Sequence, residues 1–253
     1  MRHMGEPPSR LRSIGALLTA LIVPPLCAAC KRATASDAAL CGQCRQALAS
    51  LPAGSVATRG GGAIAESFAA FPYEGVAREL VGALKFKGAV ALAREMAQMM
   101  VERAPTALVE SALLVPAPAH PVRRRVRGFN QAALLAAEVS RLTGAPVWDC
   151  LWRSGGRGPQ STMSRTERLE LPAGAVRCSE SAPPASASRS AIEGESLTTK
   201  VVLLDDVSTT GVTLERCASG IRERHDVHIG ALTFASTSAH PARFESQART
   251  GAG

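Results

Sequence analysis

The sequence predicts an α/β protein in which helices flank both faces of a parallel sheet, preceded by a small cysteine-bearing module. Three observations support this. From residue 111 onward, apolar strand patterns alternate with amphipathic helical patterns, which implies crossover connections between parallel strands. The strand at 201–204 is wholly apolar, as strands buried on both faces are. Two Cys-x2-Cys pairs lie close together at 27–44, ahead of the first predicted strand.

The composition indicates a globular chain with a core of small and aliphatic side chains. Hydrophobic residues make up 46% of the 253 residues and aromatic residues only 4%, so Ala, Leu and Val must fill the core. This length suits one ordinary domain with a small accessory module. No apolar run reaches the roughly 20 residues that a membrane-spanning helix needs.

The first apolar run covers residues 14–23 and follows two arginines. It fits either the hydrophobic region of a signal peptide or a helix that packs on its own protein. Pro24 and Pro25 end the run and a cysteine pair follows at once, which favours the packed helix and a cytoplasmic protein. We therefore expect an N-terminal tail and short helix over residues 1–23.

The cysteine pairs predict a structural Zn²⁺ site over residues 24–50. Ten residues separate the two pairs, and four thiolates in two such knuckles suit tetrahedral Zn²⁺. A segment this short has almost no core of its own, so a metal would supply its folding energy. A disulfide pair and an iron–sulfur site are the alternatives. The expected ligands are Cys27, Cys30, Cys41 and Cys44.

A glycine-bearing joint at 51–62 leads into the main domain, which we expect over residues 63–237 with a flexible tail at 238–253. Apolar residues at helical spacing predict two helices within 75–103, divided by Gly88, and a helix at 131–142 stopped by Gly144. Strands are expected at 65–71, 113–115, 146–151, 200–206 and 229–235, with a further helix at 212–224. In such sheets a ligand binds beyond the carboxyl ends of the strands.

The segment after the strand at 201–204 is typical of a phosphate site. Asp205 and Asp206 come first, then small hydroxyl residues and Gly211, and then a helix. A helix N-terminus offers free N–H groups and a partial positive charge, and glycine lets the backbone approach an anion. The carboxylates repel phosphate but accept hydrogen bonds from sugar hydroxyls. A phosphate at one end and a diol at the other describe ribose 5-phosphate.

Two other interpretations of this segment are available. A Walker B strand also ends in acidic residues, but it requires a phosphate loop with a Gly-Lys dipeptide, and the chain has none. A plain strand–turn–helix with a Ser/Thr cap would not need two acids and so many small polar residues together. Residues 120–168 add nine arginines against three acids, which suits a polyanionic ligand or, alternatively, a solvated basic surface.

Residues 201–213 resemble the phosphoribosyl-pyrophosphate (PRPP) motif of type I phosphoribosyltransferases. The N-terminal cysteine pairs resemble the zinc ribbon of the competence-associated ComF family, and the resemblance extends over about residues 20–236. Four further segments carry it: Tyr73-x-Gly75-x-x-Arg78-x-Leu80-Val81-x-x-Leu84-Lys85-Phe86-x-Gly88, Val115-Pro116-x-Pro118-x-His120-Pro121, Arg127-Gly128-Phe129-Asn130-Gln131-Ala132 and Pro159-Gln160-x-x-x-Ser164-Arg165-x-Glu167-Arg168.

The resemblance implies a type I phosphoribosyltransferase fold and a PRPP site. Asp205 and Asp206 would meet the ribose hydroxyls, and Mg²⁺ would arrive on the pyrophosphate. Residues 155–168 would form a closing flap, with Arg165 and Arg168 neutralising the leaving group. The expected phosphate loop is Val207, Ser208, Thr209, Thr210, Gly211, Val212 and Thr213. The expected pyrophosphate loop contains Pro118, Ala119 and His120.

Several of these residues also have a structural interpretation. His120 would touch pyrophosphate or cap the turn before Pro121. Lys85 would reach the active site or lie on the surface with its stem against apolar groups. Asn130 caps a helix by default, and together with Gln131 it has a substrate contact as a second interpretation.

The resulting function hypotheses belong to two classes. The first is an enzyme that binds PRPP with Mg²⁺ and transfers ribosyl 5-phosphate to an unknown nitrogen acceptor. The second is a non-enzymatic PRPP or nucleotide sensor, or an accessory protein of natural transformation that binds single-stranded DNA or DNA-uptake proteins through the arginine-rich face and the zinc module. The fold does not decide between them.

Overall fold

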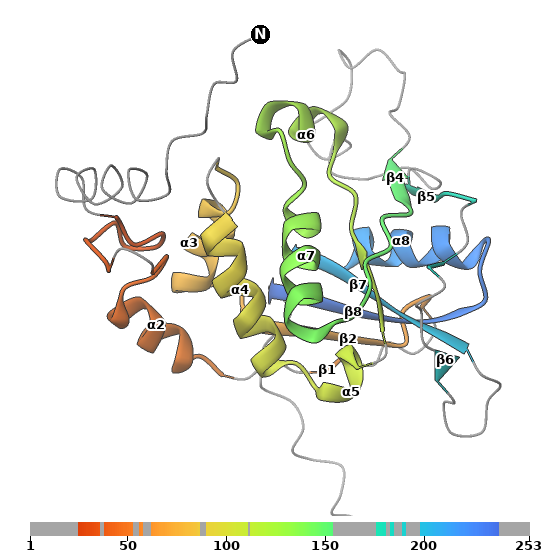
Figure 1. Ribbon diagram of the computed structural model, residues 1–253, viewed down its shortest axis with the longest axis horizontal. Coiled ribbons are helices and arrows are strands. Elements are labelled where there is room, and N and C mark those ends of the chain that lie inside the picture. Colours follow the sequence, from red (N-terminus) through yellow and green to blue (C-terminus); the bar gives the residue numbers. More distant parts are fainter. Residues whose placement is uncertain are drawn as a thin grey trace, which may run out of the picture.

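Figure 1 shows the computed structural model, in which helices lie on both sides of a central sheet. The structure describes residues 25–35, 38–52, 56–57, 62–86, 90–110, 112–153, 176–180, 183–184, 189–190 and 198–237. The expectations for the N-terminal helix at 13–23, the flap at 155–168 and the tail at 238–253 lie outside these residues. Among the described helices, none is both long and apolar enough to cross a membrane.

The central sheet is built on four parallel strands. Their spatial order is β2 (Glu66–Pro72), β8 (Val227–Ser236), β7 (Thr198–Ser208) and β3 (Leu113–Pro116). Two short strands run antiparallel to this group: β1 (Val56–Ala57) pairs with β2, and β6 (Arg189–Ser190) pairs with the start of β7. Beyond β3, a parallel bridge between Leu114 and Val147 continues the sheet.

Strand β7 divides the core in two. Val202 and Leu204 pack on the side covered by α3 (Gly75–Ala83), α4 (Val90–Arg103) and α7 (Gln131–Thr143). Val201 and Leu203 pack on the opposite side, beneath α8 (Val212–Arg222) and the hairpin of β4 (Leu151–Arg153) and β5 (Val176–Cys178). All four side chains are completely buried. The predicted α/β architecture with helices on both faces is therefore confirmed.

Most predicted elements lie within two or three residues of their expected bounds, but one expectation was wrong. At 146–151 only Val147 bridges to the sheet, and β4 begins at Leu151. Two helices were not predicted at all, and the first of them is α6 (Pro121–Arg127), which holds the arginine cluster. Four arginines give no apolar periodicity, so only its end signals reveal it: a proline in the first turn and Gly128 at φ 83° after the last turn. The short helix α5 (Thr106–Val109) was not expected either.

The cysteine segment shares its core with the sheet. Its helix α2 (Gly42–Ala49) buries Cys44 and Leu48, and these join Cys27 and Leu40 in the same apolar cluster as α3, α4 and one face of the sheet. A segment this short gains most of its apolar burial from that neighbour.

Arg103 joins the cysteine segment to β2. Its guanidinium donates hydrogen bonds of 3.1–3.4 Å to a carbonyl of β2 and to four carbonyls at and after the C-terminal end of α2. It also lies 4.1 Å from the centroid of the Phe71 ring. The acceptors are the carbonyl oxygens of Leu48, Ala49, Leu51, Pro52 and Ala70. A helix C-terminus carries partial negative charge, so the cation stabilises the end of α2.

Replacing Arg103 tests whether it holds the cysteine segment against β2. Arg103→Met removes the five hydrogen bonds and the cation–π contact, so we expect the free energy of unfolding in urea to fall by about 2–4 kcal/mol. Arg94→Met, at an exposed position of the same helix, is the matched control and should change it by less than about 0.5 kcal/mol. Equal effects of the two substitutions would contradict the bridging role of Arg103.

Candidate functional site

The carboxyl edge of the sheet brings the end of β3 beside the end of β7. The Ala117 N–H donates to the carbonyl oxygen of Leu204 at 2.8 Å, so the loop after β3 starts next to Asp205. Asn130 fixes this loop from the other side: its Nδ2 donates to the carbonyl oxygen of Ala117 at 2.9 Å, while its Oδ1 accepts from the N–H of Ala132 at 3.2 Å and caps α7. The loop predicted to bind pyrophosphate, residues 118–120, therefore begins at a position fixed by two strands and a helix.

Asp205 and Asp206 occupy the point where β7 leaves the core. Asp205 Oδ1 accepts from the Asp206 N–H at 2.9 Å. Burial raises the pKa of Asp205 well above its ordinary value, and the neighbouring charge of Asp206 raises it further. Burial also raises the pKa of Asp206. Because the two negative charges are only partly compensated, this pair favours the binding of hydrogen-bond donors or of a cation.

Three cations from separate elements act on this pair. The charges of Lys85, which follows α3, and Arg127, at the end of α6, oppose the rise in the pKa of Asp206. Arg153, the last residue of β4, opposes the rise in the pKa of Asp205. For Lys85 the sequence left two interpretations open, an active-site position and a surface position. Arg153 was counted only within the basic stretch; its one sequence signal was its place immediately before the polar, basic segment at 155–168.

The loop between β7 and α8 is held by the residue that follows β8. Thr237 donates from its N–H to the Ser208 carbonyl at 3.1 Å and from its hydroxyl to the Thr209 carbonyl at 2.8 Å. Thr209 and Thr210 are exposed, and Gly211 takes φ 75° at the N-cap of α8. Glycine reaches this left-handed conformation without strain and offers no side chain to cap the helix. The half-exposed Thr213 and the more exposed Val212 begin the first turn, whose N–H groups suit an anion.

Glu215 is the one acidic residue in the first turn of α8, and its carboxylate is held by the segment leading into β2. Its Oε2 accepts from the Ala63 N–H at 2.9 Å. A Cβ added at Gly62 would lie 2.6 Å from Glu215 Oε1. A carboxylate at a helix N-terminus stabilises the helix but repels a bound anion. The contact with residues 62–63 therefore fixes where this negative charge lies.

The four cysteines of the predicted metal site converge. Their Sγ atoms all lie within 4.8 Å of one another, and those of Cys30 and Cys41 are 3.6 Å apart. Zn–S bonds of about 2.3 Å in a tetrahedron place sulfur atoms about 3.8 Å apart, so the donor set fits Zn²⁺. All seven cysteines are free thiols, and no disulfide joins these four.

Local backbone geometry accounts for this convergence. In the first knuckle, Lys31 takes φ 62° and its N–H donates to the carbonyl of Cys27 at 3.0 Å, which turns the chain back toward Cys30. In the second knuckle, Cys41 is the N-cap of α2 and Cys44 lies in its first turn. The partial positive charge of a helix N-terminus favours thiolate ligands there.

The thiols differ in their tendency to ionise. The backbone N–H of Arg32 lowers the pKa of Cys30 to about 6, whereas burial raises the pKa of Cys44 to about 12. Cys30 would thus already be ionised when a metal arrives, whereas Cys44 would release its proton on binding.

Other predicted residues have mixed outcomes. His120 caps α6, because its Nδ1 accepts from the Val122 N–H at 3.3 Å; a pyrophosphate contact stays a prediction. Gln131 opens α7 with only 5% of its surface exposed. Arg165 and Arg168 lie outside the described residues, so their proposed role also stays a prediction.

Comparisons with known proteins identify no family for this chain. No protein-family model matches it, and no curated protein matches it. Among solved structures, it is similar to one titled "Structure of the allosteric regulatory enzyme of purine biosynthesis", with 15% sequence identity and a TM-score of 0.35. The match covers 59% of this chain and 27% of that one, so the likeness extends over about a quarter of the larger protein.

The raised pKa of Asp205 has a consequence for stability. A carboxyl group whose folded-state pKa lies above its ordinary value of 3.8 contributes stability below pH 3.8, and this contribution is lost as the pH rises through the folded-state pKa. Asp205→Asn removes that loss. The melting temperature of the variant should therefore match wild type near pH 4 and exceed it at pH 7, by about 3–5 °C per unit of pKa shift.

Melting curves from pH 4 to pH 8 measure this difference. Asp226→Asn, at an exposed position just before β8, is the control and should change the melting temperature little. A variant less stable than wild type at pH 7 would show that burial does not govern this carboxyl group.

Loss of one thiolate tests the metal site. Purified wild-type protein is expected to carry about one Zn per chain, and Cys41→Ser should carry almost none, because three ligands hold structural zinc poorly. Elemental analysis by mass spectrometry measures the content. Cys217→Ala, on the buried face of α8, should retain the metal. A Cys41→Ser protein with full zinc content would place the metal elsewhere.

Proposed function

We propose that this protein is a phosphoribosyltransferase of the ComF type, which binds PRPP with Mg²⁺ and transfers ribosyl 5-phosphate to a nitrogen acceptor in the cytoplasm. One observation carries the proposal: β7 holds a half-buried carboxylate pair near its carboxyl end, and the N-terminus of α8, with Gly211 as its N-cap, follows the strand closely. This supplies acceptors for a diol and donors for a phosphate within one loop.

The 5-phosphate would bind the loop of residues 207–213. The first-turn N–H groups of α8 provide donors, and the positive φ of Gly211 turns the backbone toward the anion. The two hydrogen bonds from Thr237 hold the loop in place before any ligand arrives. Preorganised donors bind more tightly because less ordering is needed on binding.

The pyrophosphate would lie among the cations around the carboxylate pair. Lys85 and Arg127 lie on the side of Asp206, and Arg153 lies on the side of Asp205. The loop of residues 118–120 starts beside the same acids. Mg²⁺ bound to PRPP would neutralise part of the leaving charge. Arg165 and Arg168 are proposed to add to this positive field.

The proposed transfer requires substrate binding and electrostatic stabilisation, and it requires no nucleophilic side chain. The bond between the ribose C1 and the pyrophosphate oxygen breaks, its electron pair leaves with pyrophosphate, and the lone pair of the acceptor nitrogen forms the new bond to C1. Positive charge develops on the ribose ring as this happens. Asp205 and Asp206, facing the ribose hydroxyls, would hold the sugar and stabilise that charge.

A second candidate rests on α6. This helix presents the exposed side chains of Arg124 and Arg125 together with the exposed Val122 and Val126, and Figure 1 shows it at the end of α7 that lies farthest from α5. A basic helix with apolar side chains fits a single-stranded nucleic acid, with arginines on phosphates and apolar groups near bases. On this alternative the protein is a DNA-binding accessory factor or a nucleotide sensor of natural transformation.

Calorimetric titration with PRPP and Mg²⁺ tests the proposed site. We expect saturable binding to wild type, and Asp205→Asn combined with Asp206→Asn should weaken it at least about tenfold, because charged hydrogen bonds to the sugar are lost. Asp226→Asn, just before β8 and therefore at the opposite edge of the sheet, is the matched control and should bind normally. Unchanged affinity of the double variant would remove these acids from the site.

Release of pyrophosphate separates the two classes of function. Release in the presence of one nucleobase or amine identifies the enzyme and its acceptor. Binding without release from any acceptor favours the sensor, whereas salt-sensitive binding of single-stranded DNA without PRPP binding favours the accessory factor.

A further inference from the structure

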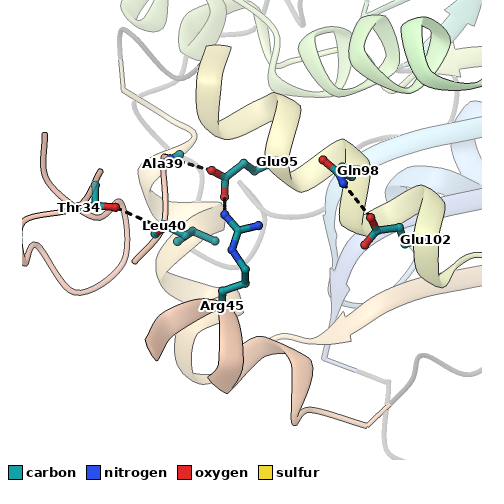
Figure 2. A network of polar contacts seen from close by, with 7 residues as sticks. All are labelled: Thr34, Ala39, Leu40, Arg45, Glu95, Gln98 and Glu102. Carbon is teal, nitrogen blue, oxygen red and sulfur yellow. Dashed lines mark hydrogen bonds and ion pairs between the residues drawn. The ribbon is translucent and has the colours of Figure 1, made fainter. Parts of the chain in front are cut away.

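Glu95, in the middle of α4, contacts the cysteine segment on both sides of its second knuckle. Its Oε1 accepts from the N–H of Ala39 at 2.7 Å, and its Oε2 accepts from Arg45 Nη2 at 3.2 Å (Figure 2). Ala39 lies two residues before Cys41, and Arg45 directly follows Cys44. One carboxylate from the sheet domain therefore holds the chain where it enters and leaves the Cys41-x2-Cys44 knuckle.

The same contact reaches the first knuckle. The carbonyl oxygen of Ala39 accepts from the N–H of Ala28, which lies between Cys27 and Cys30, at 2.8 Å. Thr34 reinforces the link, since its hydroxyl donates to the carbonyl of Leu40 at 3.3 Å (Figure 2). Holding the backbone of Ala39 therefore fixes the positions of both knuckles relative to each other.

Glu95 is placed to make this contact strong. Its side chain is 16% exposed, whereas that of Arg45 is 54% exposed. A carboxylate largely removed from water gains more from a backbone N–H donor than an exposed one does. On either side of it along α4, Ala93, Met96 and Ala97 are completely buried, so the helix cannot easily rotate away.

We propose that Glu95 is a positioning residue of the four-cysteine metal site, and that it couples metal occupancy to the stability of α4. Glu95 does not belong to the cluster of potential ligands, which among the described residues comprises the four cysteines alone. It acts through the backbone: the knuckles are held apart at the ligand spacing before the metal arrives, so less chain ordering accompanies binding. This inference does not rest on the phosphoribosyl site.

Coupling between two parts of a protein is reciprocal. If Glu95 strengthens metal binding, metal binding must strengthen the Glu95 contacts by the same factor. The shared core extends this effect, because Cys27 and Cys44 pack in the same apolar cluster as Leu92 and Met96 of α4. Removal of Zn²⁺ should therefore loosen α4 as well as the cysteine segment.

Zinc affinity provides the first test. Glu95→Gln keeps the shape of the side chain but weakens both contacts, so we expect Zn²⁺ to bind about 10–100-fold more weakly in competition with a chromophoric chelator. Glu102→Gln is the matched control: Glu102 is exposed on the same helix, its carboxylate accepts from Gln98 at 2.8 Å, and its replacement should leave the affinity unchanged (Figure 2). Equal Zn²⁺ affinity of Glu95→Gln and wild type would overturn the proposal.

Hydrogen exchange of the wild-type chain provides a second test that needs no variant. Stripping Zn²⁺ with a chelator should accelerate amide exchange in α4 and α2 at least about tenfold, while the amides of β7, buried between both layers, change little. Accelerated exchange in α2 with unchanged exchange in α4 would show that the coupling is absent. This measurement decides the question even if Glu95→Gln fails to fold.

Discussion

The burial of β7 on both faces is the constraint on which the carboxyl edge of the sheet depends. Four successive apolar side chains lock the strand between two layers of helices, and pairing with β3 and β8 sets its register. The side chains of β7 therefore first become accessible at Asp205. The same burial that aims the carboxylates also desolvates them, so placing the site there opposes the stability of the unliganded protein.

Sequence patterns predicted the local elements along the chain better than the contacts between segments that are distant in sequence. The β7–loop–α8 unit and its two acids were predictable because apolar periodicity, a glycine and the following helix are local signals. The electrostatic effect of Arg153 on Asp205 and the hydrogen bond of Glu95 to Ala39 were not predictable, because each involves segments whose approach depends on the whole fold. Helix α6 was missed for a different reason: none of the side chains that the structure describes on it is buried, so no apolar stripe marks it.

Two charged side chains of α4 hold the cysteine segment against the sheet domain by hydrogen bonds to its backbone. The anionic Glu95 accepts hydrogen bonds from a backbone N–H and an arginine of the segment. The cationic Arg103 donates hydrogen bonds to carbonyl oxygens at the end of α2. Both charges are therefore satisfied largely by groups that α2 and its flanking turns leave unpaired. The apolar cluster between the two residues supplies most of the buried surface, and the two charges specify how the cysteine segment is oriented on the sheet domain.

The contact between Glu215 and residues 62–63 limits how the two parts of this chain can be connected. A side chain at Gly62 would push the Glu215 carboxylate aside, and the Ala63 peptide donates its N–H to the same group. A change in the length of the connection between the cysteine segment and β2 disturbs this contact least where it leaves Gly62 and Ala63 in place. A substitution at Gly62 would displace the acid in the first turn of α8, so a residue of the connecting segment influences the charge at the N-terminus of that helix.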